Sequence, residues 1–111
     1  MGFARACALA DIREDEALGV TIEGQDVAVA RHGDEVFAVE DLCSHAAVAL
    51  SEGEVDDCTI ECWLHGSRFD LRTGKPTSFP ATEAVATFPV DVRGDDVYVD
   101  IQSTLNGVVP A

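Results

Sequence analysis

The sequence contains few basic residues. Only 7 Lys and Arg residues stand against 21 Asp and Glu, so the formal charge is -14 with neutral histidines and the pI is near 4.2. Binding to nucleic acid or to an anionic membrane depends on Lys and Arg side chains that displace counterions, and this composition argues against both. A basic patch on a protein partner would suit the acidic surface far better.

Long apolar runs are also missing. No stretch approaches the roughly 20 apolar residues that a membrane-spanning helix needs. The first residues, Met-Gly-Phe-Ala-Arg-Ala-Cys, lack the charged and then apolar layout of a signal peptide. We therefore expect a cytoplasmic protein. With 111 residues, 47% of them hydrophobic and 25% charged, the chain is expected to form one soluble globular domain.

Helical periodicity is scarce, and short strands account for most of the chain. Only residues 12–18 and 46–50 look capable of a helical turn, and neither is long enough for a stable helix. Short segments rich in Val, Ile and Phe, separated by turns that contain glycine, predict antiparallel strands. These segments are 3–9, 18–23, 27–32, 35–40, 58–62, 68–71, 86–92 and 96–101. The pattern predicts an all-β sandwich or barrel.

Two short segments interrupt the strand pattern and contain a possible metal-ligand set. They are Cys43-Ser44-His45 and Cys62-Trp63-Leu64-His65, which read C-x-H and C-x-x-H. Thiolate and imidazole bind zinc, iron and iron–sulfur centres, whereas calcium and magnesium require oxygen ligands. Without an export signal, this cysteine spacing indicates metal ligation or reactivity rather than disulfides.

The distribution of the ligands bears on the choice between zinc and iron. Zinc fingers usually pair the cysteines close together and place the histidines on a following helix. Here each segment supplies one cysteine and one histidine. This arrangement suits a binuclear cluster in which one iron takes both thiolates and the other both imidazoles, as in a Rieske [2Fe-2S] centre. The two loops would then have to lie side by side at one end of a β scaffold.

At these residues the chain resembles the Rieske family. Cys43-Ser44-His45 and the run Cys-Trp-Leu-His-Gly-Ser-Arg-Phe-Asp at 62–70 are similar to its two cluster loops, and the strand layout is similar over nearly the whole chain. Within the family, the length resembles the small bacterial Rieske-type ferredoxins that serve multicomponent non-haem iron oxygenases. The resemblance implies a Rieske iron–sulfur fold over 1–101. Cluster-binding loops at about 41–80 would be inserted in a β base of 1–40 and 81–101, followed by a tail, 102–111, that we expect to be loose.

The resemblance also implies a function. One [2Fe-2S] cluster would be held by Cys43, His45, Cys62 and His65, and the protein would transfer one electron at a time. The electron would come from an NAD(P)H-dependent flavoprotein reductase and go to a terminal oxygenase of the aromatic-ring hydroxylating type, through transient docking. We assign no catalytic residue and expect no small-molecule substrate, so the chain is expected to be an electron carrier of an oxidoreductase system rather than an enzyme.

Three other interpretations stay open at this point. One is an accessory or redox-sensing protein associated with Fe–S cluster assembly. Another is a small subunit of a nitrite-reductase-like system, which would share the fold without the cluster, although the intact ligand set argues against it. The third is a structural zinc module. Each would replace the electron-carrier role with a binding or structural one.

The chain departs from the cytochrome-complex branch of the family at three positions. Val48 and Leu64 stand where that branch has cysteines that form a disulfide between the loops, so no such disulfide is expected. Phe69 replaces a tyrosine whose hydroxyl bonds to a ligand sulfur, while Ser67 is retained. Hydrogen bonds to sulfur raise the reduction potential, so we expect a value in the lower part of the roughly -150 to +300 mV range of Rieske centres.

Several other residues have simpler expected roles. Cys7 and Cys58 are predicted to be packed, structural thiols, because free cysteine behaves as a small buried hydrophobe. Arg68, Arg72 and Lys75 are either a docking feature or a solvated strand edge. Pro80 resembles the proline of a loop that covers the cluster in this family, with a plain turn as the alternative. None of these residues belongs to the predicted ligand set.

Overall fold

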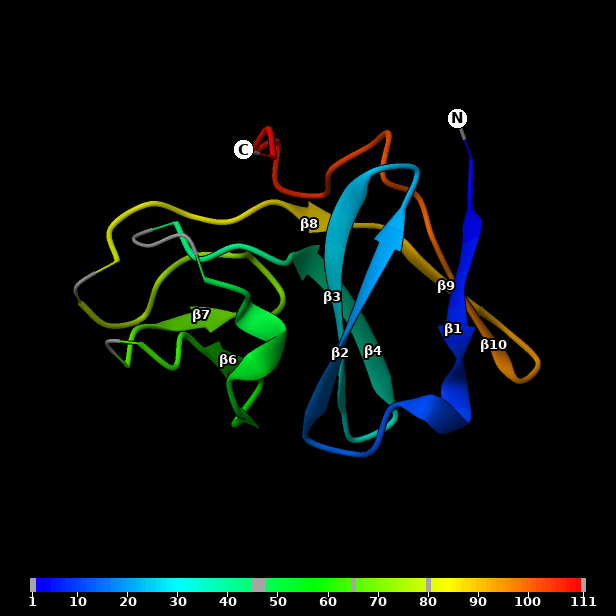
Figure 1. Ribbon diagram of the computed structural model, residues 1–111, viewed down its shortest axis with the longest axis horizontal. Helices are drawn as coiled ribbons and strands as arrows, with labels where there is room; N and C mark the ends of the chain where they lie inside the picture. Colours follow the sequence, from blue (N-terminus) through cyan, green and yellow to red (C-terminus); the bar gives the residue numbers. More distant parts are fainter. Residues whose placement is uncertain (1, 45–47, 65, 80, 111) are drawn as a thin grey trace.

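The computed structural model describes residues 2–44, 48–64, 66–79 and 81–110 (Figure 1). These residues form ten strands and two short 3₁₀ turns. The elements are β1 (Ala4–Ala8), η1 (Leu9–Asp11), β2 (Glu16–Ile22), β3 (Gln25–His32), β4 (Glu35–Glu40), η2 (Leu50–Glu52), β5 (Val55–Asp56), β6 (Thr59–Glu61), β7 (Arg68–Asp70), β8 (Thr87–Phe88), β9 (Val90–Arg93) and β10 (Asp96–Val99). The prediction of an all-β antiparallel fold is confirmed.

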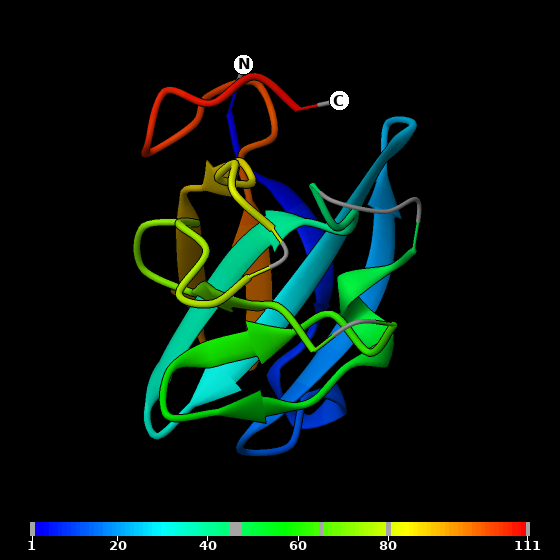
Figure 2. The same cartoon turned by 90° about the vertical axis from the view of Figure 1, so that its left-hand side faces the viewer.

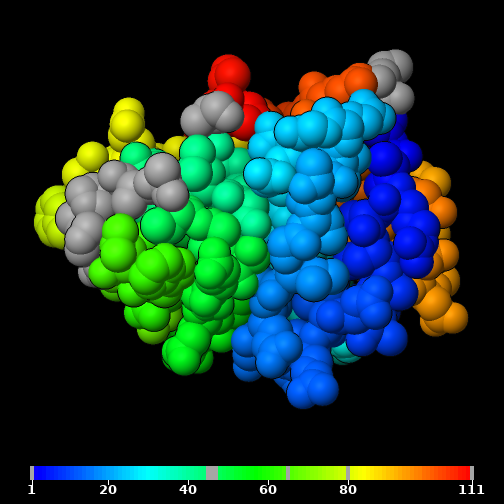
Figure 3. Space-filling view, viewed as in Figure 1, coloured from blue at the N-terminus to red at the C-terminus, as the bar shows by residue number. Residues whose placement is uncertain are grey.

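The strands form three antiparallel sheets. Two of them, in the orders β1-β10-β9 and β2-β3-β4-β8, make a base, and the third, β5-β6-β7, is smaller. Figure 1 shows the β1-β10-β9 sheet at the right, β2, β3 and β4 in the middle, and β6 and β7 at the left. In the space-filling view of Figure 3 the small sheet and its loops, in green and yellow, form one end of the molecule. The predicted ligand segments belong to this end.

Strand β3 is buried on both faces and connects the two parts of the core. Val27 and Val29 pack into the hydrophobic cluster of the base, whereas Ala28 and Ala30 pack into the cluster beneath the small sheet. Successive side chains of a strand point to opposite faces, so this alternation of Val and Ala places large residues on one side and small ones on the other. The small face leaves room for the cluster-loop end to pack closely on the base.

The predicted strand at 86–92 is two strands in the structure. β8 pairs with β4, whereas β9 pairs with β10, so the two belong to different sheets. Pro89 separates them. Proline has a fixed φ and no N–H to give to a strand ladder, so a strand tends to change direction there. The apolar run therefore crosses from one sheet to the other, and our prediction of one continuous strand was wrong.

One of the two predicted helical turns was wrong, and the other is only partly described. The 12–18 segment is not helical: the 3₁₀ turn η1 ends at Asp11, and β2 begins at Glu16 after Asp15, which has a φ of 59°. Of the 46–50 segment, residues 46 and 47 lie outside the described part of the chain, and the turn that is described there is η2, Leu50–Glu52. Among the described residues, no helix is long or apolar enough to cross a membrane.

The hairpin between β5 and β6 corrects the prediction for Cys58. Asp56 pairs with Thr59, which leaves Asp57 and Cys58 as a two-residue loop with φ values of 50° and 58°. Positive φ at both central residues is the signature of a type I′ turn, which glycine and asparagine normally occupy. Cys58 therefore lies on a turn rather than inside a strand, although it still packs partly against the core of the cluster-loop end.

The C-terminal segment has no regular secondary structure, but it is attached to the body of the protein. Leu105 N donates to the Thr87 carbonyl oxygen at 2.8 Å, and the Asn106 side chain bonds to Thr73 and Val85. Figure 2 shows this segment, in orange and red, running along one edge of the molecule. The division into a domain at 1–101 and a tail at 102–111 stays a prediction.

Gly53 allows the first predicted loop to return close to the second. A Cβ atom at this position would lie 1.7 Å from the carbonyl oxygen of Glu61, the residue before Cys62. The Glu61 N–H in turn donates to the Glu54 carbonyl oxygen at 2.8 Å. The backbones of the two loop regions therefore meet at a spacing that only glycine permits.

Gly53→Ala should lower the free energy of unfolding by about 3 kcal/mol, because the backbone oxygen cannot move aside as a flexible side chain would. Chemical denaturation measures this change. Gly33→Ala is the matched control: its surroundings are open and only its φ of 61° is unfavourable, so about 1–2 kcal/mol is expected. Equal losses in the two variants would contradict the close-approach argument.

Candidate metal centre

The two cysteines of the predicted ligand set share one buried core. Cys43 follows the end of β4, and Cys62 directly follows β6. Cys43 is 3% exposed and Cys62 is fully buried, and both belong to the hydrophobic cluster that also contains Phe69 and Ala81. The fold thus brings together two thiols from separate loops. The other two predicted ligands, His45 and His65, lie outside the described residues.

The first loop closes on itself just after Cys43. The Cys43 N–H donates to the Val48 carbonyl oxygen at 3.0 Å, and Val48 packs against the core. Ser44 Oγ donates to the Glu83 carbonyl oxygen at 2.6 Å. The loop is therefore tied at its base to a third segment that lies far along the chain.

The second loop is a tight turn around Cys62. The Cys62 N–H donates to the Ser67 carbonyl oxygen at 2.6 Å, and the Gly66 N–H donates back to the Cys62 carbonyl oxygen at 2.9 Å. Gly66 has a φ of 78°, a left-handed conformation that glycine adopts without strain. Sequence reasoning placed His65 before this Gly-Ser pair, and the structure shows that the pair closes the turn.

Ser67 links the second loop to the same third segment. Its side chain is fully buried, and its Oγ accepts a hydrogen bond from the Ala81 N–H at 3.0 Å. A hydroxyl that accepts one hydrogen bond still has its own proton to donate. This buried hydroxyl can therefore act as a donor as well.

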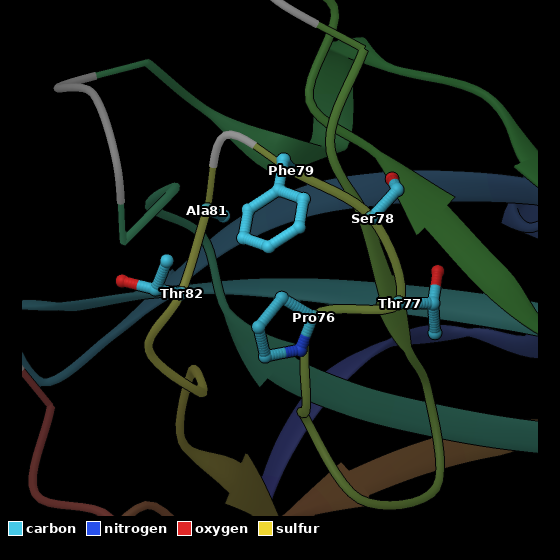
Figure 4. Close-up of a pocket in the computed structure, with 6 residues that line it drawn as sticks. All are labelled: Pro76, Thr77, Ser78, Phe79, Ala81 and Thr82. Atoms are coloured by element: carbon cyan, nitrogen blue, oxygen red, sulfur yellow. The ribbon is translucent and has the colours of Figure 1, made fainter.

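The third segment, residues 76–79 and 81–83, contacts both loops. Ser78 Oγ accepts from the Arg68 N–H, and the Thr77 N–H donates to the Arg68 carbonyl oxygen. Figure 4 shows the segment doubling back, with the rings of Pro76 and Phe79 between its two limbs in this view. The predicted covering residue, Pro80, lies outside the described part of the chain.

Exposure differs sharply between the bases and the tips of the loops. Beyond the buried sulfur of Cys62, Trp63 is 49% exposed and Leu64 is 42% exposed, and Phe79 on the third segment is 84% exposed. A [2Fe-2S] cluster of the Rieske type needs thiolates on one side and imidazoles on the other. Buried thiols beneath surface loops that carry one histidine each fit that requirement.

The remaining cysteines do not belong to this donor set. Cys7 lies in the other hydrophobic cluster, inside the base. Cys58 lies in the turn before β6, whereas Cys62 directly follows that strand, so the two thiols lie at opposite ends of it. Burial raises the pKa of both the Cys7 and the Cys58 thiols. Cys7 and Cys58 are free thiols in the structure.

Two of the three cations after the second loop are engaged within the chain. Arg72 donates two hydrogen bonds to Glu35, at 2.6 and 2.9 Å, and its guanidinium lies over the ring of Phe37. The hydrogen bond from Arg72 lowers the pKa of the Glu35 carboxyl. Arg68 pairs with Glu61 at 3.4 Å. These contacts favour a structural role for both arginines over the docking role that their clustering suggested.

Comparison with known proteins identifies the family. The model of the Rieske [2Fe-2S] domain matches residues 2–89. The chain belongs to this family, and its cofactor is a Rieske-type [2Fe-2S] cluster.

Several relatives resemble the chain over most of its length. The ferredoxin subunit of 3-phenylpropionate/cinnamic acid dioxygenase from Shigella flexneri serotype 5b is 42% identical over 97 residues, which are 86% of this chain and 91% of the relative. The ferredoxin of carbazole 1,9a-dioxygenase from Nocardioides aromaticivorans IC177 is 36% identical with a TM-score of 0.85, covering 89% of this chain and 97% of that protein.

A solved complex adds a further comparison. It contains reduced oxygenase and oxidised ferredoxin of carbazole 1,9a-dioxygenase. The matching chain is 39% identical with a TM-score of 0.82, covering 87% of this chain and 91% of its own length. The Rieske fold predicted from the sequence is confirmed by these structural matches.

The contacts of the third segment are the part of the site that the sequence did not reveal. Glu83 and Ala81 take part through backbone atoms, which no sequence motif encodes. Two serines bind them. Ser44 lies between the predicted ligands Cys43 and His45, and Ser67 follows the Gly66 that comes after His65 in the sequence. Their positions were a signal that small hydroxyl side chains anchor the loops.

Ser67→Ala should lower the free energy of unfolding by about 1–3 kcal/mol, because the Ala81 N–H would be left unpaired in a buried place. Ser78→Ala is a matched control, since Ser78 also accepts a backbone N–H through its hydroxyl but is exposed. Water can replace that bond, so a smaller loss is expected in denaturant titrations. A Ser67 variant as stable as the Ser78 variant would show that the buried bond contributes little.

Proposed function

We propose that Cys43, His45, Cys62 and His65 hold the [2Fe-2S] cluster and that the protein passes single electrons from an NAD(P)H-dependent flavoprotein reductase to a terminal oxygenase of the aromatic-ring hydroxylating type. The observation that carries this proposal is the burial of Cys43 and Cys62 in one core beneath exposed loop tips. The resemblance to ferredoxins of dioxygenases supports the choice of partner. When bound, the cluster accepts and releases one electron.

The residues of the chain hold the loops and exclude water from the sulfur side. Cys43 and Cys62 are fixed by their backbone hydrogen bonds within each loop. Ser67 holds its hydroxyl proton in a buried position, where it is available to a sulfur acceptor and would favour the reduced form. No side chain here has to act as a general acid, a base or a nucleophile, and the chain binds no small-molecule substrate.

The exposed apolar residues around the loop tips form the docking face that we propose for both partners. This tip patch consists of Trp63, Leu64 and Phe79. Exposed aromatic side chains provide much of the binding energy of transient interfaces when a partner covers them. The excess of carboxylates elsewhere on the chain would attract a basic partner surface and accelerate encounter.

We also propose a location and a domain division. A carrier that is reduced through NAD(P)H works where that cofactor is found, which supports the cytoplasm. Residues 1–101 would form the single Rieske domain, with the cluster loops at about 41–80 between the two halves of the base. The small sheet at one end of the β base supports this division.

Loss of any of the four ligands should abolish the cluster. Cys43→Ala, His45→Ala, Cys62→Ala and His65→Ala should each lose the visible absorption, the EPR signal of the dithionite-reduced protein and the acid-labile sulfide. Cys58→Ala and Cys7→Ala serve as controls and should keep all three. A Cys58 variant without the signal would contradict the ligand assignment, and a colourless wild-type protein with one zinc would contradict the cluster itself.

Phe79→Ala should slow electron delivery without changing the cluster. We expect the second-order rate constant for oxidation of the reduced protein by the terminal oxygenase to fall about tenfold, because one exposed aromatic contact is lost. Phe3→Ala is the matched control, since Phe3 is an exposed phenylalanine next to β1 in the base. Stopped-flow spectroscopy measures the rate. Equal rates in the two variants would remove Phe79 from the docking face.

The same experiment tests the carrier role. The wild-type protein should be reduced by NAD(P)H only when the flavoprotein reductase is present, and should then be oxidised by the terminal oxygenase within one turnover of that enzyme. An accessory protein of cluster assembly has no need for either reaction to be fast. Slow reduction or slow oxidation of a cluster-loaded protein would therefore contradict the proposed function.

A further inference from the structure

The C-terminal segment lies against regions that lead into the cluster loops, although it is far from them in the sequence. It begins after β10 and runs toward the small-sheet end of the molecule (Figures 1 and 2). The Rieske family model matches residues 2–89, so this segment lies beyond the part of the chain that the family describes.

Asn106 makes four hydrogen bonds that join three backbone regions. Its Nδ2 donates to the carbonyl oxygen of Thr73 at 2.9 Å and to that of Val85 at 2.8 Å. Its Oδ1 accepts from the N–H groups of Thr87, at 3.3 Å, and Val108, at 3.2 Å. An amide side chain with both donors and its acceptor engaged is held in one orientation, because a flipped amide would oppose like groups.

Asn106 joins the backbone that follows the second cluster loop to the backbone that follows the third segment. Thr73 lies in the turn after β7, the strand that leaves the second cluster loop, and Val85 lies on the chain that returns from the third segment. The Val85 N–H donates to the Gly74 carbonyl oxygen at 2.9 Å. A Cβ at Gly74 would lie 2.2 Å from the Val85 carbonyl oxygen and 2.8 Å from Asn106 Nδ2. Glycine is therefore required at position 74, where these three segments of the chain meet.

The residues after Asn106 reach the first loop. Val108 and Val109 line a groove of about 260 Å³ together with Cys43, Ser44 and Glu83. Glu83 is the residue whose carbonyl oxygen accepts the Ser44 hydroxyl. Val109 is exposed and Val108 is partly buried against the base, so this part of the segment forms an outer wall beside the ligand Cys43.

We propose that residues 105–109, the C-terminal latch, hold the third segment against the two cluster loops and limit the access of water and chelators to the cluster, with Asn106 as the positioning residue. The inference rests on the proposed ligand set. The latch acts through the backbone, because Asn106 holds the carbonyl groups of Thr73 and Val85 in place. The third segment is then positioned so that Ala81 binds Ser67 and Glu83 binds Ser44. Loss of the amide would leave two carbonyl groups and two N–H groups without this partner.

Asn106→Ala and Asn106→Asp test the latch in the cluster-loaded protein. The Asp variant keeps the size of the side chain and the acceptor for Thr87 and Val108, but it places an oxygen against the carbonyl groups of Thr73 and Val85. Both variants should lose iron to the chelator bathophenanthroline disulfonate about tenfold faster than the wild type. Ser103→Ala, in the same segment with an exposed side chain, should lose iron at the wild-type rate.

A second control separates the latch from general stability. Val97→Ala weakens the core of the base on β10, outside the backbone groups that Asn106 binds, and should lower the thermal unfolding midpoint without accelerating the loss of iron well below that midpoint. The proposal is overturned if the Asp variant keeps iron as the wild type does, or if Val97→Ala loses it equally fast. Failure of the ligand assignment is distinguishable, because one of the four ligand variants would then keep its cluster or the Cys58→Ala variant would lose it.

Discussion

Two thiols from separate loops must lie in one apolar core while the tips of the same loops remain at the surface. Each loop meets this requirement with a backbone hydrogen bond from its own cysteine: Cys43 donates to Val48, and Cys62 donates to Ser67. The bonds turn the chain back immediately after each cysteine, and the described residues that follow, Ser44, Trp63 and Leu64, are exposed. The approach of the two loops then depends on Gly53, where any side chain would collide with the backbone before Cys62. The shape of the site therefore depends on these backbone contacts more than on the predicted ligand side chains.

The loops are stabilised through a third segment rather than through a covalent bond between them. Val48 and Leu64 occupy the positions where the cytochrome-complex branch of the family has its disulfide. Here Ser44 binds the Glu83 carbonyl group, and Ser67 binds the Ala81 N–H, so both loops share one anchor. Two hydrogen bonds to one segment can replace a disulfide only if that segment is itself held in place. The contacts of Asn106 with the exits of the site supply that restraint.

The sequence predicted most of the strands for physical reasons, and its errors have equally specific causes, whereas the ligand set stays a prediction. The Val and Ala alternation of β3 is visible in the sequence because burial on two faces imposes it. The apolar run at 86–92 gave no sign of a change of sheet except Pro89, and the local pattern cannot say which strand is the partner on either side. Cys58 was placed in a strand because it begins the strand-like segment 58–62, and only the register of Asp56 with Thr59 reveals the two-residue turn. The backbone partners of the serines could not be predicted, because almost every residue has the same backbone N–H and carbonyl groups and no sequence pattern marks the ones that bind.

The distribution of charge and apolar surface has a consequence for how such a carrier works. Arg72 is bound by Glu35, and Arg68 by Glu61, so these cations offset neighbouring carboxylates instead of marking a separate basic region. The net charge of -14 therefore attracts partners at long range, whereas the tip patch provides contact only at short range. Long-range attraction accelerates encounter, and a small apolar contact allows rapid dissociation. A carrier that must leave one partner before it meets the next needs both properties, and the exposed Trp63 and Leu64 directly follow the buried Cys62.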